Sequence, residues 1–289
     1  MSGHPPTTQD AAGRLIDLRH LGRERVIGCW EVGDVLVDPG PTSCLAVLLE
    51  ALGDRRPRAL ALTHIHLDHA GASGSLVERW PDLEVWVHER GARHLAHPEK
   101  LMASAARLYG DDMQRRWGEM RPVPEENLRI LSGGERLGPF AVAYTPGHAS
   151  HHVAYLHGDS GRAFTGDVAG VRIAPSDYVL APTPPPDIDV EAWRRSLDLI
   201  AGWDPTSVAV THFGAFDDVG AHLDGVREWL ERWAPHARDH ESGRFESDLR
   251  GEIAAATDPD TAAAFEQAAP PDQLAQGLRR YWDTRESDR

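Results

Sequence analysis

A short histidine-rich segment places the strongest constraint on how this chain can fold. Residues 63–69 read THIHLDH and follow directly on an apolar segment that we expect to be a buried strand. His64 and His66 alternate on an extended backbone and so point the same way, whereas Asp68 and His69 turn in a neighbouring direction. Imidazole and carboxylate groups suit zinc, iron or manganese. One loop can therefore offer ligands to two adjacent metal ions, provided that the fold brings further ligands to it.

Three later segments repeat the context of that loop, in which a predicted strand is followed by a turn with one histidine or aspartate. The side chains concerned are His148, Asp167 and His212, which follow predicted strands at 140–144, 163–165 and 207–210. A lone histidine beside a turn is more often structural than a metal ligand. Four strand-end motifs in one chain are much harder to explain in that way, so we expect them to meet at one site.

Hydrophobic periodicity predicts that strands and helices are mixed along the whole chain. Further strands are expected at 26–30, 34–37, 58–63, 84–88, 129–131 and 152–156, with a second strand-rich half starting at residue 128. Helices are expected at 45–52, 72–80, 190–200 and 221–233. We divide the chain into a loose N-terminal tail (1–13), a catalytic domain (14–233) with a mostly helical insertion at about 89–120, and a helical C-terminal extension (234–289). The extension is expected to be an appended helical segment or an oligomer contact.

The composition limits the partners that the chain is expected to have. Its 289 residues include 30 Lys and Arg against 45 Asp and Glu, which gives a formal net charge of −15. An acidic surface repels phosphate backbones and anionic lipids, so we expect a small-molecule substrate and neither nucleic acid nor a membrane as partner. Two cysteines exclude a disulfide framework, and the first residues do not resemble a signal peptide. We therefore expect a cytoplasmic protein, and homodimer formation is left open.

The ordered motifs H-x-H-x-D-H, P-G-H, T-G-D and T-H resemble those of the metallo-β-lactamase superfamily of hydrolases, in the broad sense that includes its glyoxalase-II-like branch. They stand at residues 64–69, 146–148, 165–167 and 211–212, and the resemblance extends over roughly residues 14 to 233. It implies an α+β fold, the four-layer αββα sandwich, with two mixed sheets face to face, helices outside and the site at one edge. The helical insertion and the helical C-terminal tail are additions to that fold.

The resemblance also implies a role for each site residue. His64, His66 and His148 would hold a first metal ion, Asp68, His69 and His212 a second, and Asp167 would bridge the two. Asp38, in the early turn D-P-G, matches a position that supports the ligands from behind. The expected cofactor is two Zn²⁺ per chain, with iron or manganese as alternatives. Two close dications lower the pKa of a shared water, and Asp68 is the residue expected to orient the resulting hydroxide.

Sequence reasoning leaves the reaction only partly defined. The first expectation is a metallo-hydrolase that cleaves a small ester, thioester or lactone. One alternative is a mononuclear iron sulfur dioxygenase acting on a persulfide, with the iron held by His64, His148 and Asp167; another is a non-catalytic metal-binding scaffold. Residues 211–214 read THFG, where glyoxalase-II-like thioesterases carry His-Glu-Tyr-Thr, and this departure weakens a glutathione thioester as substrate.

For several further side chains the sequence allows either a functional role or a purely structural one. His151 and His152 follow His148 closely and could transfer protons, but we favour one packing beside the metal loop and the other facing solvent. Tyr178, ahead of the proline-rich segment 181–186, could donate to an oxyanion, although a packed loop tyrosine is the more common outcome. Four residues of the insertion could either touch substrate or pack on the sheet: Leu101, Met102, Tyr109 and Trp117.

Overall fold

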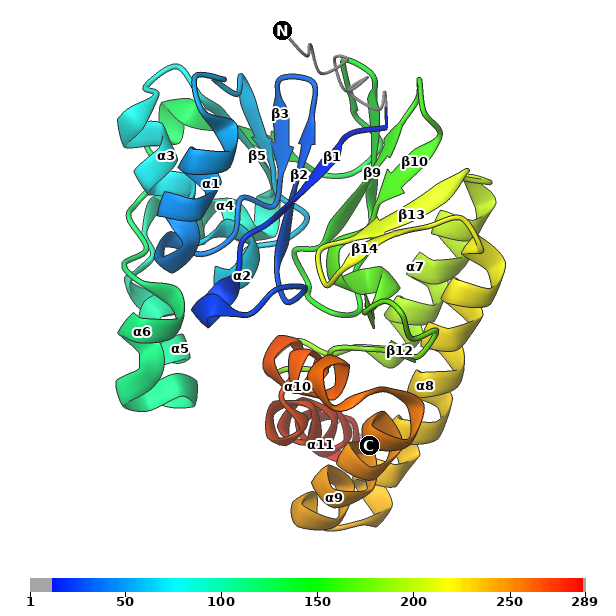
Figure 1. Ribbon diagram of the computed structural model, residues 1–289. Coiled ribbons are helices and arrows are strands. Elements are labelled where there is room, and N and C mark those ends of the chain that lie inside the picture. The colour runs from blue at the N-terminus through cyan, green and yellow to red at the C-terminus, as the bar shows by residue number, and fades with distance from the viewer. Residues whose placement is uncertain (1–11, 288–289) are drawn as a thin grey trace, which may run out of the picture.

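Two six-stranded sheets lie face to face in the body of the molecule, as a computed structural model that describes residues 12–287 shows (Figure 1). Helices α1 (Leu45–Leu52), α3 (Ser73–Arg79) and α4 (Glu89–Ala96) cover the outer face of the first sheet (Figure 1). Helices α7 (Val190–Gly202) and α8 (Val219–Asp239) cover that of the second. The expected αββα sandwich is thereby confirmed. Of the N-terminal tail that we predicted for residues 1–13, residues 1–11 lie outside the described part of the chain.

The first sheet is antiparallel at one end and parallel at the other. Its strands, in spatial order, are β1 (Arg14–Asp17), β2 (Gly28–Val32), β3 (Val35–Val37), β4 (Ala59–Ala61), β5 (Glu84–His88) and β6 (Leu128–Leu131). Strands β3 to β6 run parallel. We expected residues 129–131 to belong to the second strand-rich half, but β6 pairs with β5 and forms the edge of the first sheet.

The second sheet is also mixed, with β10 and β13 as its parallel pair. Its strands, in spatial order, are β14 (Gly214–Phe216), β13 (Ser207–Val210), β10 (Arg162–Phe164), β9 (Val153–His157), β8 (Phe140–Tyr144) and β7 (Arg136–Leu137). The short pair β11 (Val171–Arg172) and β12 (Val179–Leu180) lies apart from both sheets.

Alternating side chains hold the layers together. In β4, Ala59 and Ala61 belong to the core between the sheets, whereas Leu60 belongs to the core under the helices. The small side chains of β4 leave room between the sheets for aromatic rings, among them Trp86 and Phe140, whose ring centroids are 5.9 Å apart. Burial of such aromatic area on both sides fixes the strand register, because a slip by one residue would turn these side chains outward.

The last two helices of the insertion and the helices of the C-terminal extension face each other below the lower edge of the sandwich (Figure 1). The insertion comprises α4 (Glu89–Ala96), α5 (Glu99–Tyr109) and α6 (Met113–Trp117). The C-terminal extension comprises α9 (Ser242–Ala256), α10 (Pro259–Ala268) and α11 (Pro271–Ser287). Helix α8 continues without a break past residue 233, so the sandwich and the extension share one helix.

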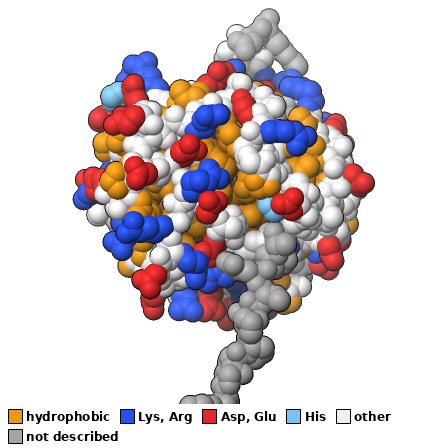
Figure 2. Space-filling model, turned by 90° about the horizontal axis from the view of Figure 1, so that it is seen from above, with side chains coloured by type: hydrophobic (Ala, Val, Ile, Leu, Met, Phe, Trp, Pro, Cys, Tyr) orange, Lys and Arg blue, Asp and Glu red, His pale blue; other side chains and the backbone are white. Residues whose placement is uncertain are grey.

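The surface carries charges of both signs. On the face at the top of the sandwich, acidic and basic side chains are interspersed with apolar ones (Figure 2). None of the helices within residues 12–287 is both long enough and apolar enough to cross a membrane.

Candidate metal centre

The seven predicted ligand residues meet at one edge of the sandwich because four strands end there. His64 follows β4, His148 follows β8, Asp167 follows β10, and His212 follows β13. Backbone hydrogen bonds tie the two sheets together at this edge, with the Val153 amide donating to the Thr63 carbonyl at 2.8 Å. Residues that are far apart in sequence are therefore held as one cluster by the strand ends beneath them.

The first group of side chains consists of three imidazoles whose ring nitrogens converge. His66 Nδ1 lies 3.0 Å from His64 Nε2 and 3.0 Å from His148 Nε2. His148 Nδ1 lies 2.8 Å from the carbonyl oxygen of Pro182. Because a carbonyl only accepts hydrogen bonds, Nδ1 carries the proton, and His148 Nε2 presents its lone pair to the cluster. These three nitrogens could hold one metal ion.

The second group pairs a carboxylate with two imidazoles. Asp68 Oδ2 lies 3.4 Å from His212 Nε2 and 3.7 Å from His69 Nε2. His212 Nδ1 donates to the Val26 carbonyl at 2.5 Å. Both Nε2 atoms are buried without a hydrogen-bond partner among the described residues, an arrangement that leaves their lone pairs for a cation. This group too could hold a metal ion.

Asp167 lies between the two groups. Its Oδ1 is 3.2 Å from His69 Nε2 and 3.5 Å from His212 Nε2, and its Oδ2 is 3.4 Å from His148 Nε2. The residue before it is Gly166, whose φ of +46° favours glycine, and a Cβ there would lie 2.4 Å from Thr63 Oγ1. The glycine thus lets the Asp167 turn approach the histidine loop closely enough for one carboxylate to reach both groups.

Asp38 supports the second group from behind. The carboxylate is fully buried and accepts a hydrogen bond from His69 Nδ1 at 2.8 Å. It also accepts from the Thr63 amide, the Thr63 hydroxyl and the Thr211 hydroxyl, each at 2.8 Å. Since Thr63 follows the first sheet and Thr211 the second, one carboxylate orients a ring of the cluster and joins the two sheets. The position expected for Asp38 from the sequence is the position that it occupies.

Charge interactions within the cluster shift the pKa values of its imidazoles in two directions. Burial and the neighbouring His148 lower the pKa of His66 to about 4, so that its ring is neutral near pH 7. Burial alone would raise the pKa of Asp68 and of Asp167, but His69 and His212 hold both values below the ordinary range. Neutral imidazoles and ionised carboxylates are the forms that coordinate metals. The carboxylates in turn raise the pKa values of His69 and His212, so a metal ion would displace a proton from each of these two rings. The donor types and their burial fit a pair of metal ions.

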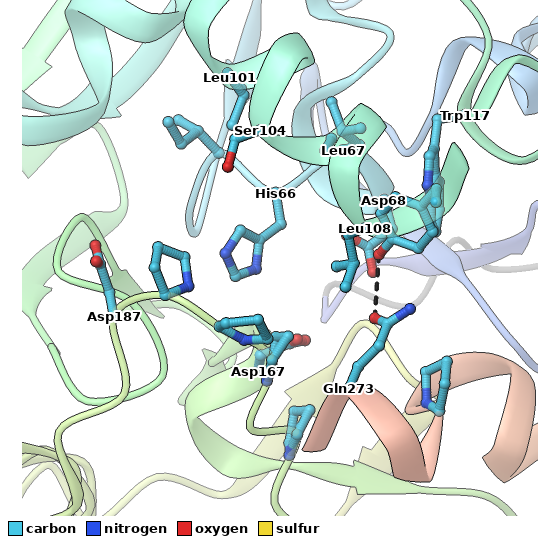
Figure 3. Close-up of a pocket in the computed structure, with 18 of the residues that line it drawn as sticks. His66, Leu67, Asp68, Leu101, Ser104, Leu108, Trp117, Asp167, Asp187 and Gln273 are labelled. Atoms are coloured by element: carbon cyan, nitrogen blue, oxygen red, sulfur yellow. Dashed lines mark hydrogen bonds between the residues drawn. The ribbon is translucent and has the colours of Figure 1, made fainter. Parts of the chain in front are cut away.

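A pocket of about 410 Å³ opens above this cluster. His66, Asp68 and Asp167 form its floor, as Figure 3 shows. One wall comes from the insertion and includes Leu101, Leu108 and Trp117 (Figure 3). The opposite wall comes from the C-terminal extension and the proline-rich segment that ends before Asp187. Within residues 12–287, a single hydrogen bond links the insertion to the extension, from the Tyr109 hydroxyl to Gln273 Oε1 at 3.3 Å (Figure 3).

Of the other residues that the sequence suggested as substrate contacts, some line the pocket and others pack in the core. Leu101, Tyr109 and Trp117 line the pocket, whereas Met102 packs on the core outside it. Tyr178 is a packed tyrosine, as favoured, because its hydroxyl donates to Glu252 at 2.7 Å and it does not line the pocket.

The two histidines after the third motif also differ from each other. His152 is buried beside the metal loop and stacks on His64 with ring centroids 5.1 Å apart. His151 is half-buried, lines the pocket and lies with its ring centroid 5.6 Å from that of His66. The pair thus divides into one core residue and one pocket residue, rather than one core residue and one solvent residue.

Two groups of atoms that help to form the site were not predicted from the sequence. The carbonyls of Pro182 and Val26 orient ligand rings, and a backbone atom leaves no signal in residue type. The wall formed by Gln267 to Pro270, Gln273 and Leu274 was also missed. The only available signal was the amphipathic pattern of the C-terminal helices, which indicates a buried face but does not identify what that face covers.

Comparison with known proteins gives a consistent result. A family model described as the metallo-beta-lactamase superfamily matches residues 31–212. The chain is 31% identical over 195 residues to the metallo-beta-lactamase fold-containing protein ST1585 of Sulfurisphaera tokodaii, a match that covers 64% of this chain and 70% of that one. The solved structure of ST1585 superposes with a TM-score of 0.68 at 21% identity, over 92% of this chain and 97% of that one.

More distant relatives carry names that are more specific. The hydroxyacylglutathione hydrolase of Xylella fastidiosa strain M23 is 31% identical over 125 residues, but the match covers only 43% of this chain and 37% of that enzyme. The structure of TTHA1623, described as a di-iron-bound form, matches with a TM-score of 0.53 at 28% identity, over 69% of this chain and 93% of that one.

Proposed function

Because this chain belongs to the metallo-beta-lactamase superfamily, we propose that it is a hydrolase that uses two divalent metal ions to cleave a small ester, thioester or lactone. The observation that carries the proposal is the position of Asp167, whose two carboxylate oxygens face different ligand groups. A site for one ion would need no such shared carboxylate. A pocket of about 410 Å³ is of the size that takes small molecules, which supports a small-molecule substrate.

In this proposal His64, His66 and His148 hold one ion, Asp68, His69 and His212 hold the other, and Asp167 contacts both. Nitrogen and carboxylate donors in these numbers suit zinc, and iron or manganese are alternatives. When bound, such ions supply a Lewis acid for the carbonyl under attack and lower the pKa of a water. The aligned ring nitrogens and the Asp38 carboxylate fix the ligands before any substrate arrives, which reduces the reorganisation needed during the reaction.

Asp68 is the residue of the cluster that we assign a further role. Its side chain is 19% exposed, whereas the side chains of His69 and His212 are almost fully buried. It therefore faces both the ligand cluster and the pocket. The lowered pKa keeps it ionised, so that it can accept a hydrogen bond from the attacking water and direct the water's lone pair at the substrate.

Metal analysis coupled to a substrate panel tests the proposal. We expect about two zinc ions per chain and metal-dependent hydrolysis of at least one ester, thioester or lactone. His66→Ala and Asp68→Ala should each lower kcat/KM by several orders of magnitude, because each change removes a ligand. His97→Ala, an exposed histidine outside the pocket, is the matched control. One iron per chain with oxygen uptake on a persulfide would instead establish the sulfur dioxygenase reaction.

A further inference from the structure

The pocket differs in charge from the rest of the chain. The chain carries a formal net charge of −15, yet the pocket above its floor is lined by Arg90, His94 and Lys100 on the insertion side. Neither Arg90 nor Lys100 forms an ion pair with a residue in the described range 12–287. Asp187 is a negative charge on the same rim, but it hydrogen-bonds the Ser150 hydroxyl at 2.6 Å and forms no ion pair with Arg90 or Lys100 within residues 12–287. Unpaired cations at the mouth of a pocket attract anions from an otherwise acidic surface.

Ring and hydrogen-bond contacts place Arg90 at one end of the pocket, and Lys100 lies in the first turn of α5, about two turns before Leu108. Arg90 lies over the ring of Tyr144, at 5.8 Å from its centroid, and the Tyr144 hydroxyl donates to the Ser150 carbonyl. His151 lies beside Ser150 and close to His66. The end of the pocket near Arg90 is thus next to the imidazole group of His64, His66 and His148.

The other end of the pocket is apolar and aromatic. Leu108, Tyr109 and Trp117 of the insertion line it, and the rings of Tyr109 and Trp117 are in edge contact with centroids 5.1 Å apart. Ala268, Ala269 and Leu274 of the extension complete this end. The Tyr109 hydroxyl is occupied by Gln273, and Arg116 lies 3.5 Å from Asp112. Few polar atoms therefore remain for a polar ligand, and a hydrocarbon chain fits the surface better.

We propose that the pocket selects an ester or thioester that joins a hydrocarbon chain to an anionic group, and that Arg90 and Lys100 bind the anion. The bond to be cleaved lies over His66, Asp68 and Asp167, between the two ends of the pocket. The hydrocarbon lies against Leu108 and Trp117. This inference rests on the proposed hydrolase function and adds the chemical class of substrate that the two ends recognise.

Matched thioesters test the inference on the metal-loaded full chain. The hexanoyl thioester of 3-mercaptopropanoate carries one negative charge, and that of 2-mercaptoethanol carries none. We expect kcat/KM to be about tenfold higher for the anionic compound at low ionic strength, and salt should reduce the difference. A second pair, the hexyl monothioester of succinate and the hexyl thioester of butyrate, places the charge on the acyl side. Comparison of the two pairs shows which half of the substrate carries the anion.

One double variant and its matched control test whether Arg90 and Lys100 recognise the anion. Arg90→Gln combined with Lys100→Gln should bring the anionic-to-neutral ratio of kcat/KM close to one. Arg93→Gln with Arg107→Gln, exposed residues of the same helices that do not line the pocket, should leave the ratio unchanged. A preference that survives in the first double variant, or that is lost equally in the second, overturns the role of Arg90 and Lys100.

The length of the acyl chain of the substrate tests whether the apolar end binds hydrocarbon. From acetyl to hexanoyl thioesters, kcat/KM should rise about three- to fourfold per methylene. Leu108→Ala should flatten this rise, whereas Leu199→Ala, an exposed leucine on α7, should not. If kcat/KM does not change with the length of the acyl chain, the assignment of this end is wrong.

A binding experiment separates this inference from the proposed function. S-Hexyl-3-mercaptopropanoate and S-hexyl-2-mercaptoethanol are thioethers that cannot be hydrolysed, and calorimetry on the metal-loaded protein measures their affinities. Tighter binding of the anionic thioether, lost in the Arg90 and Lys100 double variant, supports the inference even if no thioester is turned over. Equal affinities overturn it even if neutral thioesters are hydrolysed.

Discussion

The floor and the walls of the pocket are built by different means. Beneath the floor, the outer nitrogens of three ligand rings have fixed partners: Asp38 for His69, the Pro182 carbonyl for His148 and the Val26 carbonyl for His212. The walls are half-buried helices held to each other, within residues 12–287, by one hydrogen bond, between Tyr109 and Gln273. The floor is thus specified by directional polar contacts and the walls by apolar packing. Substitutions in the floor should abolish chemistry, and those in the walls should change which substrates are used.

The largest effect is expected at Asp167, because it contacts both ligand groups. Asp167→Ala should lower kcat by roughly 10³-fold or more and weaken binding of both ions, since each loses a charged ligand. His212→Ala should mainly weaken one. Metal titration followed by elemental analysis measures both occupancies. If Asp167→Ala retains two ions per chain at wild-type affinity, the carboxylate does not join the two groups.

Acid should weaken the floor through His222, which lies beneath it. Its Nε2 donates to the Ala169 carbonyl at 2.8 Å, in the same turn as Asp167. Burial lowers the pKa of His222 to about 4, against an ordinary value of 6.5. Between these values the unfolded chain binds the proton more tightly, so stability is full above pH 6.5 and falls by up to about 3 kcal/mol as the pH drops to 4. In His222→Gln, chemical denaturation should show a flatter pH dependence over this range. An unchanged slope would mean that His222 is not held neutral by the fold.

Substitution of Asp38 tests whether metal binding depends on the hydrogen bonds that hold the ligand rings from behind. Asp38→Asn keeps the size of the side chain but weakens the hydrogen bond that orients His69. We expect a loss of about 10- to 100-fold in affinity for one ion. Asp34→Asn, an exposed aspartate that pairs with Arg58, is the matched control and should change neither metal binding nor turnover. Equal behaviour of the two variants in a chelator competition assay would remove Asp38 from the support of the site.

The smallest effect is expected at the hydrogen bond between the walls. Tyr109→Phe should cost about 1 kcal/mol of stability and change KM by less than about fivefold, with metal content unchanged. A double-mutant cycle with Gln273→Met isolates the coupling between the two side chains. A coupling energy near zero would show that the walls are held together by packing alone. A change in metal content would show that the walls and the metal site are not independent.

The same contrast explains what the sequence could predict. Four residues of the cluster lie in turns that follow strands with strong local signals, so His64, His148, Asp167 and His212 could be assigned to one edge before the structure was known. The ends of β5, β8 and β13 were also predicted from their apolar runs. These positions are determined locally, by strand propensity and by the turn that follows.

The parts that escaped prediction depend on contacts between distant segments. The apolar pattern of Leu128–Leu131 fits a strand of either sheet. Only its pairing with β5 determines that it belongs to the first sheet. The short strands β7, β11, β12 and β14 have too few residues for a periodic signal. The pocket wall formed by Gln273 and Leu274 depends on which face of α11 meets the insertion, and that is a property of tertiary packing.

The bond between Tyr109 and Gln273 joins residues that are 164 positions apart. Because a chain is made from its N-terminus, all seven proposed ligand side chains exist once residue 212 has been added, whereas the second wall exists only after residue 274. During synthesis the chain therefore carries all seven proposed ligands before the second wall of the pocket exists. A premature stop after α8 would leave the chain at that stage.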